Sequence, residues 1–220
     1  MLSPGGKRQK TADGDWIPTG TGGNASKIRL VTYNIRSGRS GGLEAALRAM
    51  AQANVDLGVF QETKLTDDIY TRMSSGYRVI ATNAPSKHQG GVALFYRDSD
   101  QFQVEAYQSF GPNVISFQLV SGRRRWFVVG CYIPPTCNTT IEQVTQALSH
   151  RPDNAELLVV GDLNVDLKDP EGSERDEGIA AALAVEDLED MSTHFCGRRG
   201  RRDGRTWSMV RLGRTTSSQF

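Results

Sequence analysis

Carboxylates, amides and one phenol follow apolar runs of this sequence at four separate places. These polar residues are Asn34, Glu62, Tyr132, Asp162 and Asn164. A single acidic or amide residue after a strand is most often a turn residue or a helix cap, so each position alone is weak evidence for a site. Four such positions at the mouth of one rigid sheet would supply the convergent polar groups that an active site needs. We therefore predict that these side chains form one site.

The apolar runs that must carry these residues are predicted β-strands, because they are rich in β-branched and aromatic residues. The predicted strands cover residues 28–35, 55–60, 77–81, 91–96, 102–107, 114–120, 125–133 and 157–160. Apolar residues at helical spacing predict helices over 43–50 and 140–148, and a short helix over 178–184. Many strands interleaved with few helices predict a mixed α/β or α+β layered domain.

Composition fits one globular domain with a full core. The chain has 220 residues, 38% of them hydrophobic, and a formal net charge of only +1, which argues neither for nor against nucleic acid. Its three cysteines are odd in number and lack CxxC spacing, so free thiols in a reducing compartment are favoured over a metal or disulfide site. No run approaches the roughly 18 apolar residues of a membrane span, and the N-terminus lacks the apolar core of a secretory signal. We expect an intracellular protein that does not enter membranes.

The first 26 residues differ in amino-acid composition from the rest of the chain. They are rich in Gly, Ser, Thr and Asp, and their apolar residues are too sparse to offset the entropy of ordering. We predict a disordered leader over 1–26 and one domain over 27–220. The basic run at 7–10 suggests a weak nuclear-import signal, for which a solvated tail is the preferred alternative.

Several short segments give the sequence a family resemblance. Thr-Tyr-Asn at 32–34, Gln-Glu-Thr at 61–63 and Gly-Asp-Leu-Asn at 161–164 resemble signature segments of the endonuclease/exonuclease/phosphatase superfamily. The segments 90–94, 132–134 and 206–207 agree with that pattern in order and spacing. Because of its Thr-Tyr-Asn-Ile-Arg-Ser opening and a late Arg-rich stretch, the chain is most similar to the endonuclease domain of non-LTR (LINE-type) retrotransposons.

The resemblance implies both a fold and a chemistry. The fold is an α/β (α+β) four-layer sandwich, in which two mostly antiparallel β-sheets pack face to face and helices flank them. The chemistry is Mg²⁺-dependent phosphodiester hydrolysis, with Mn²⁺ as a substitute ion. Mg²⁺ suits a site that supplies one or two carboxylates plus waters.

The resemblance also implies a role for each site residue. Glu62 matches the metal-binding glutamate, and Asn34 helps to hold the metal or the phosphate. Asp162 matches the residue that orients or deprotonates the attacking water. Asn164 matches an amide that contacts the phosphate and the metal shell, and the hydroxyl of Tyr132 is expected to hydrogen-bond the phosphate.

One part of the family pattern has no counterpart in this sequence. Related domains continue with a Ser-x-x-Asp strand and a final Ser-Asp-His segment, whereas this sequence reads Ser-Ser-Gln-Phe at 217–220. None of His88, His150 and His194 falls at the family position, so we assign no catalytic histidine. We therefore expect a C-terminally incomplete domain that lacks the final strands. Low turnover and marginal solubility are the expected consequences.

A basic segment lies between residues 197 and 214, with seven arginines and one acidic residue. Arginines with Gly spacers beside an aromatic residue suit contact with the DNA backbone or minor groove, and a solvated loop is the alternative. The predicted nucleic-acid-binding residues are Arg198, Arg199, Arg201, Arg202, Arg205 and Trp207. Residues 123–125 are three further arginines, predicted to form a hairpin turn that adds to this surface.

Three functions therefore stay open from the sequence. The leading one is a DNA-nicking endonuclease of retroelement type, with DNA as partner and no obligate protein partner. The second is an inactive truncated remnant that still binds nucleic acid. The third is a phosphatase or phospholipase of the same superfamily, which would not obviously need the arginine segment.

Overall fold

The computed structural model describes residues 8–10, 16–18, 28–73, 75–135, 139–165, 174–186, 188–190 and 208–212. Its strands and helices, in chain order, are β1 (Arg8–Lys10), β2 (Trp16–Pro18), β3 (Leu30–Asn34), α1 (Gly42–Gln52), β4 (Leu57–Gln61), β5 (Ile69–Arg72), β6 (Tyr77–Ala81), β7 (Val92–Arg97), β8 (Gln103–Ser109), β9 (Val114–Ser121), β10 (Arg124–Tyr132), α2 (Thr139–Ser149), β11 (Glu156–Asp162), α3 (Glu174–Val185), β12 (Leu188–Asp190) and β13 (Ser208–Leu212).

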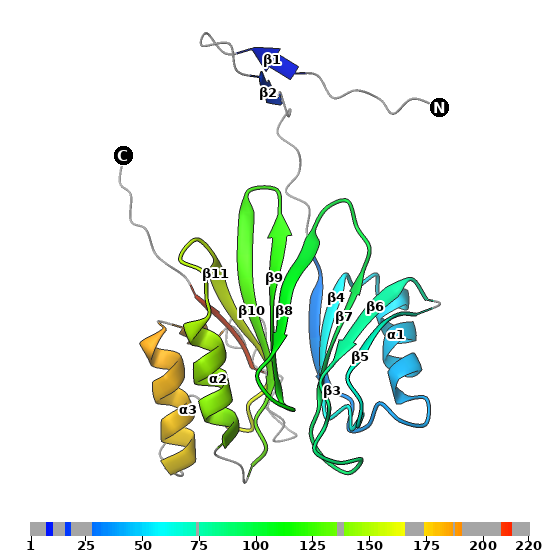
Figure 1. Ribbon diagram of the computed structural model, residues 1–220, viewed down its shortest axis with the longest axis vertical. Coiled ribbons are helices and arrows are strands. Elements are labelled where there is room, and N and C mark those ends of the chain that lie inside the picture. The colour runs from blue at the N-terminus through cyan, green and yellow to red at the C-terminus, as the bar shows by residue number, and fades with distance from the viewer. Residues whose placement is uncertain are drawn as a thin grey trace, which may run out of the picture.

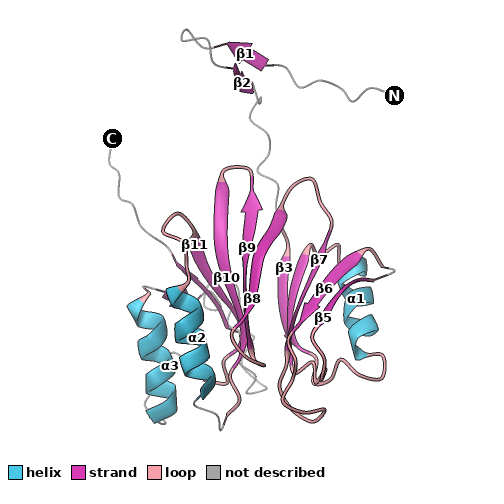
Figure 2. Ribbon diagram, viewed as in Figure 1, coloured by secondary structure: helices cyan, strands magenta, loops and turns pink. Residues whose placement is uncertain are grey.

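Two β-sheets form the centre of the molecule. One has five strands in the order β3-β4-β7-β6-β5, and the other has six in the order β12-β13-β11-β10-β9-β8. Figure 1 shows α1 on one outer face and α2 with α3 on the other, and Figure 2 shows the same four layers by element type. Among the described strands only β3–β4 and β10–β11 pair in parallel. The predicted four-layer sandwich of mostly antiparallel sheets is confirmed.

The apolar core is divided among the three spaces between these layers. Between the sheets, Val59 and Leu94 of the five-stranded sheet meet Ile115 and Phe117 of the other, all of them fully or almost fully buried. Fully burying a side chain of this size contributes about 1.5–3 kcal/mol, so this layer carries much of the stability. Gly130 of β10 lies where the two sheets approach each other closely, because a Cβ there would come within 2.7 Å of Val59 Cγ1.

The helices cover the outer faces through short apolar stripes. In α1 the stripe is Leu43, Leu47 and Met50, whose spacing of four and three residues places them on one helix face. In α3 the buried residues are Ile179 and Leu183, again four apart. Among the described residues, no helix is both long enough and apolar enough to cross a membrane.

The eight predicted strands are all present, with ends shifted by at most two residues. The prediction for α3 was too short, since the helix begins at Glu174 rather than at Gly178. Glycine inside a helix weakens the local signal, and the acidic first turn that favours the true start was overlooked.

Three strands of the two large sheets were not predicted: β5, β12 and β13. They have three to five residues, and each contains a charged residue, which weakens the strand signal. β13 pairs antiparallel with β11 across a long sequence separation. In the predicted leader, β1 and β2 pair antiparallel, and the rest of 1–26 lies outside the described residues.

Candidate active site

Four strand ends bring the predicted polar residues to one end of the sandwich. Asn34 ends β3 and Glu62 directly follows β4, in the five-stranded sheet. Tyr132 ends β10 and Asp162 ends β11, in the six-stranded sheet, where the two residues are register partners. Because each pair of strands runs parallel, each sheet presents two of the predicted site residues side by side at the C-terminal ends of neighbouring strands.

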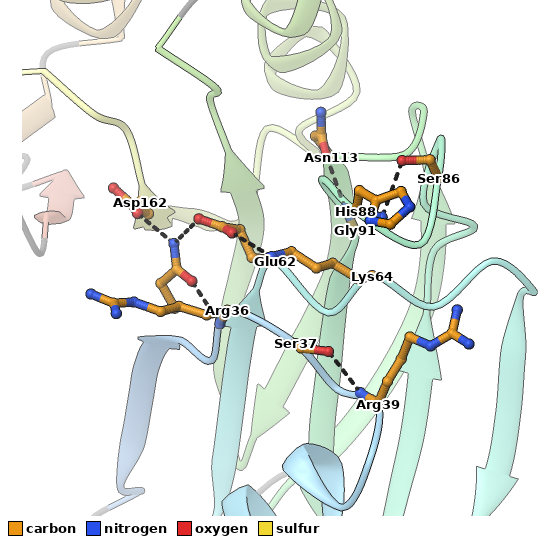
Figure 3. A network of polar contacts seen from close by, with 11 residues as sticks. Arg36, Ser37, Arg39, Glu62, Lys64, Ser86, His88, Gly91, Asn113 and Asp162 are labelled. Carbon is orange, nitrogen blue, oxygen red and sulfur yellow. Dashed lines mark hydrogen bonds and ion pairs between the residues drawn. The ribbon is translucent and has the colours of Figure 1, made fainter.

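Asn34 links the two sheets at this end. Its Nδ2 donates to Glu62 Oε1 at 2.7 Å and to Asp162 Oδ2 at 2.9 Å. Its Oδ1 accepts the Arg36 backbone N–H at 2.9 Å. This amide orientation is the one that the surroundings favour, because a swap would turn the oxygen toward two carboxylates. Figure 3 shows the Glu62 and Asp162 carboxylates near one another.

The Glu62 carboxylate is held in its ionised form. Burial by itself would raise the pKa of Glu62, but hydrogen bonds from Asn34, Lys64 and Tyr132 outweigh burial and lower the pKa overall. The Lys64 ammonium lies 3.3 Å from Glu62 Oε2. At neutral pH the site therefore offers a negatively charged oxygen pair on Glu62, with one cation beside it.

Tyr132 presents a phenol that stays protonated. Its ring is buried, and its hydroxyl hydrogen-bonds Glu62. Burial, followed by the negative charges of Glu62 and Asp162, raises the pKa of Tyr132 well above its usual range. A neutral hydroxyl can turn from Glu62 and donate its single hydrogen bond to an incoming anion, which a phenolate could not do.

The turn after β11 fixes Asp162. The Asn164 backbone N–H donates to Asp162 Oδ1 at 3.3 Å, and Asn164 Nδ2 donates to the Ile133 carbonyl at 3.0 Å. The Asn164 amide is thus turned to the backbone next to Tyr132, and does not join the hydrogen bonds around Asn34. Asn164 has a φ of 49°, in the left-handed region, as asparagine tolerates better than most residues.

Glycines and one asparagine behind the site hold Glu62. Glu62 has a φ of 53°, and Gly91, with a φ of 88°, accepts the Thr63 N–H at 3.2 Å. A Cβ on Gly91 would lie 2.4 Å from Thr63 Oγ1, so only glycine fits. Asn113 Oδ1 accepts the Gly91 N–H at 3.1 Å, and the Asn113 carbonyl accepts the Tyr132 N–H at 2.9 Å. Asn113 therefore ties the Glu62 support to the Tyr132 strand.

Two residues that matter here were not predicted from the sequence. Lys64 pairs with Glu62, and a signal existed, since it follows the Gln-Glu-Thr segment directly. Asn113 had no local signal, because its role depends on two segments that meet only in the folded chain.

Two described basic side chains near the site, Lys64 and Arg39, were not among the predicted ones. A pocket of about 210 Å³ is lined by Lys64, Arg39, Leu65, Thr66, Asp67 and Ile69, so it shares Lys64 with the site. The predicted DNA-binding residues Arg198, Arg199, Arg201, Arg202, Arg205 and Trp207 lie outside the described residues. The predicted hairpin is present, with Gly122 and Arg123 between β9 and β10. It lies at the opposite end of β10 from Tyr132, about 26 Å away at 3.3 Å per residue, and therefore far from Glu62 and Asp162.

The two described histidines do not complete the site. His150 packs edge-on against Phe110 at 5.0 Å and its Nδ1 contacts the Gln146 carbonyl, and His88 lies exposed in a turn. Neither hydrogen-bonds Glu62 or Asp162. His194 lies outside the described residues.

The donor set of the site suits a hard cation held partly by water. Within the described ranges, no group of three or more His, Cys, Asp or Glu side chains could by itself enclose a metal ion. Glu62 and Asp162 supply two carboxylates that share one amide donor. Mg²⁺ is bound through one or two carboxylates while it keeps several waters, so the residues present fit Mg²⁺.

Comparison with known proteins assigns the fold to a family. Residues 31–217 match the Endonuclease/Exonuclease/phosphatase family, whereas no curated protein sequence matches significantly. An AP endonuclease from Archaeoglobus fulgidus superposes with a TM-score of 0.61 at 16% identity, over 84% of this chain and 86% of that chain.

Two further solved structures show the same fold. The endonuclease domain of TRAS1, a telomere-specific non-LTR retrotransposon, has a TM-score of 0.61 at 17% identity and covers 86% of both chains. The 3'-5' exonuclease NExo from Neisseria meningitidis has a TM-score of 0.57 at 16% identity, over 82% of this chain and 85% of that chain. At such identities the likeness is one of fold.

Proposed function

The chain belongs to the endonuclease/exonuclease/phosphatase family, and we propose that it is a Mg²⁺-dependent phosphodiesterase of retroelement type that nicks DNA. The observation that carries this proposal is the Asn34 amide, which joins an ionised Glu62 from one sheet to Asp162 from the other. Beside them stands a phenol held in its donor form. The Glu62 and Asp162 carboxylates and the Tyr132 hydroxyl together suit the binding of a phosphate with a cation.

In this proposal Glu62 would hold Mg²⁺, and Asn34 would keep Glu62 and Asp162 in place. The ion would neutralise phosphate charge and make a bound water more acidic. Asp162 orients the attacking water and takes its proton. When the substrate binds, the Tyr132 hydroxyl turns from Glu62 to donate to a phosphate oxygen, where negative charge grows as the water oxygen bonds to phosphorus and the ester P–O bond breaks. Asn164 contributes by holding Asp162 in place, through the turn that the two residues share.

DNA is the proposed substrate because basic side chains flank the site on the five-stranded sheet. Lys64 and Arg39 line the neighbouring pocket, and Arg36 follows Asn34 on the same loop. Among solved structures with this fold are AP endonucleases and a retrotransposon endonuclease domain. The arginines at 198–205 support the same substrate from the sequence.

We propose that turnover is slow. Within the described residues neither His88 nor His150 hydrogen-bonds the site, so no imidazole there protonates the departing oxygen. A positioned general acid contributes about 10²–10⁴-fold to a rate, which sets the size of the expected deficit.

A plasmid-nicking assay tests the proposal. The full chain should convert supercoiled DNA to the open circle with Mg²⁺ and lose this activity with a chelator. Glu62→Gln and Asp162→Asn should each lower the rate by at least about 100-fold. Glu105→Gln, on the exposed strand β8, is the matched control and should leave the rate unchanged.

Other outcomes would select a different function. Hydrolysis of a phosphoinositide without DNA nicking would favour a phosphatase or phospholipase. Salt-dependent DNA binding with no nicking would indicate a non-catalytic binding protein. Nicking that persists in both site variants would contradict the assignment of these residues.

A further inference from the structure

Arg175, in the first turn of α3, reaches into the backbone behind the site. Its Nη1 donates to the Asn164 carbonyl at 3.0 Å, and its Nη2 donates to the carbonyls of Leu163 at 3.0 Å and Ile133 at 3.3 Å. Its side chain is only 11% exposed, and the neighbouring Asp176 carboxylate balances its charge at 2.5 Å. One guanidinium therefore holds three carbonyls from two segments.

The three carbonyls belong to the strand ends that carry the six-stranded sheet's part of the site. Leu163 and Asn164 directly follow Asp162, and Ile133 directly follows Tyr132. The Ile133 carbonyl also accepts from Asn164 Nδ2. Carbonyls past a strand end have no ladder partner, so they need another donor when buried. A planar fork of five N–H groups suits several acceptors at fixed angles better than an ammonium does.

We propose that Arg175 is a positioning residue, which fixes the turn after β11 and so sets how Asp162 faces Tyr132. This inference rests on the proposed function, because it assigns Arg175 a part in the same reaction. Among the described residues, Arg175 hydrogen-bonds only backbone carbonyls and Asp176, so we infer that its effect on the reaction passes through Asp162 and Asn164.

A purely structural role would be to attach α3 to the sheet, and the chain offers a control for that role. Arg151 also donates to a backbone carbonyl, that of Ala155 at 3.0 Å, and its Nη1 contacts Glu186 at 3.3 Å, just after α3. Its side chain is 22% exposed, compared with 11% for Arg175. The two arginines thus secure opposite ends of the helix, but only Arg175 touches the site turn.

The test compares Arg175→Met with Arg151→Met in the full chain. Steady-state nicking should show kcat lowered about 100-fold in Arg175→Met at a KM within about threefold, as expected for a misplacement of about 1 Å. Arg151→Met should keep kcat within about threefold, whatever its melting temperature. Equal loss of kcat in the two variants would overturn the proposal.

A second readout does not depend on activity. Hydrogen exchange followed by NMR should be at least about tenfold faster in Arg175→Met for the Asn164 N–H, bonded to Asp162, and the Ile133 N–H, bonded to the Asp162 carbonyl. Unchanged exchange at both amides would refute positioning. If the wild-type chain fails to nick DNA, the proposed function fails, and this readout still decides the role of Arg175.

Arg175→Lys covers the case in which the methionine variant does not fold. The lysine keeps the charge and an aliphatic stem, but one ammonium cannot reproduce a fork that serves three carbonyls. We expect kcat to fall at least about tenfold at an unchanged fold. Wild-type kcat in Arg175→Lys would overturn the proposal.

Discussion

The change from Gly161 to alanine is the most direct test of how closely the site depends on the pairing of β10 with β11. Gly161 pairs with Cys131, one position before the Tyr132–Asp162 pair. Its φ is 153°, and a Cβ there would lie 1.9 Å from the Cys131 carbonyl oxygen. A carbon and an oxygen of this kind need about 3.3 Å, so the strands must part by about 1.4 Å.

The cost follows from that displacement. Overpacking in a well-packed interior costs about 1–3 kcal/mol, and each ladder hydrogen bond that is stretched open costs about 1 kcal/mol. We expect Gly161→Ala to lower the free energy of unfolding by about 3 kcal/mol. In a domain of this size that corresponds to a melting temperature lower by about 6–12 °C. Because a displacement of about 1 Å at a reacting group costs about 100-fold, nicking should fall by that factor.

Gly178→Ala is the matched control. Gly178 lies inside α3 with open space where its Cβ would be. Alanine there should stabilise the helix by up to about 1 kcal/mol and leave nicking unchanged. The measurements are calorimetric melting and plasmid nicking at a temperature where both variants are folded. If Gly161→Ala melts within about 2 °C of the wild type and nicks normally, β10 and β11 do not set the site as argued.

Two further variants separate the interactions around Glu62. Asn34→Ala removes the largest of the hydrogen bonds that lower the pKa of Glu62, so that pKa should rise and the acid limb of the pH–rate profile should move to higher pH. The stability that the lowered pKa provides exists above the unfolded value near 4.5 and is lost as pH falls through the folded value, so the variant should gain less stability between acid and neutral pH. An unmoved acid limb would show that Asn34 does not govern Glu62. Tyr132→Phe should lower kcat about 100-fold but shift the acid limb less, because its bond is the smallest contributor to that lowered pKa. Wild-type kcat in Tyr132→Phe would contradict its role as a phosphate donor.

The strands could be predicted because their signals are local, whereas the four-layer order was an expectation from the family resemblance. β4 is an apolar run that is buried along its whole length, and α1 shows its stripe at 43, 47 and 50. The short strands β12 and β13 had no such signal. Their order comes from pairing with each other and with β11, which depends on the tertiary structure.

The site was partly accessible to prediction for a related reason. Polar residues at strand ends are visible in sequence, and the structure brings Asn34, Glu62, Tyr132 and Asp162 together. The amide orientation of Asn164 was not accessible, because it is set by the Ile133 carbonyl, far away in the chain. Arg175 escaped notice because its acceptors are backbone atoms, which leave no trace in residue type.

The hydrogen bond from Asn34 to Asp162 spans two sheets whose described strands share no backbone pairing. The relative position of the site residues therefore depends on how the two sheets are aligned. The apolar side chains packed between the sheets set that alignment. A substitution at Gly130 or Val59, in the core between the sheets, would shift one sheet against the other. It would lower the reaction rate without contacting any group of the site. Under selection for a new substrate, beneficial substitutions should accumulate in the core between the sheets as well as around the site.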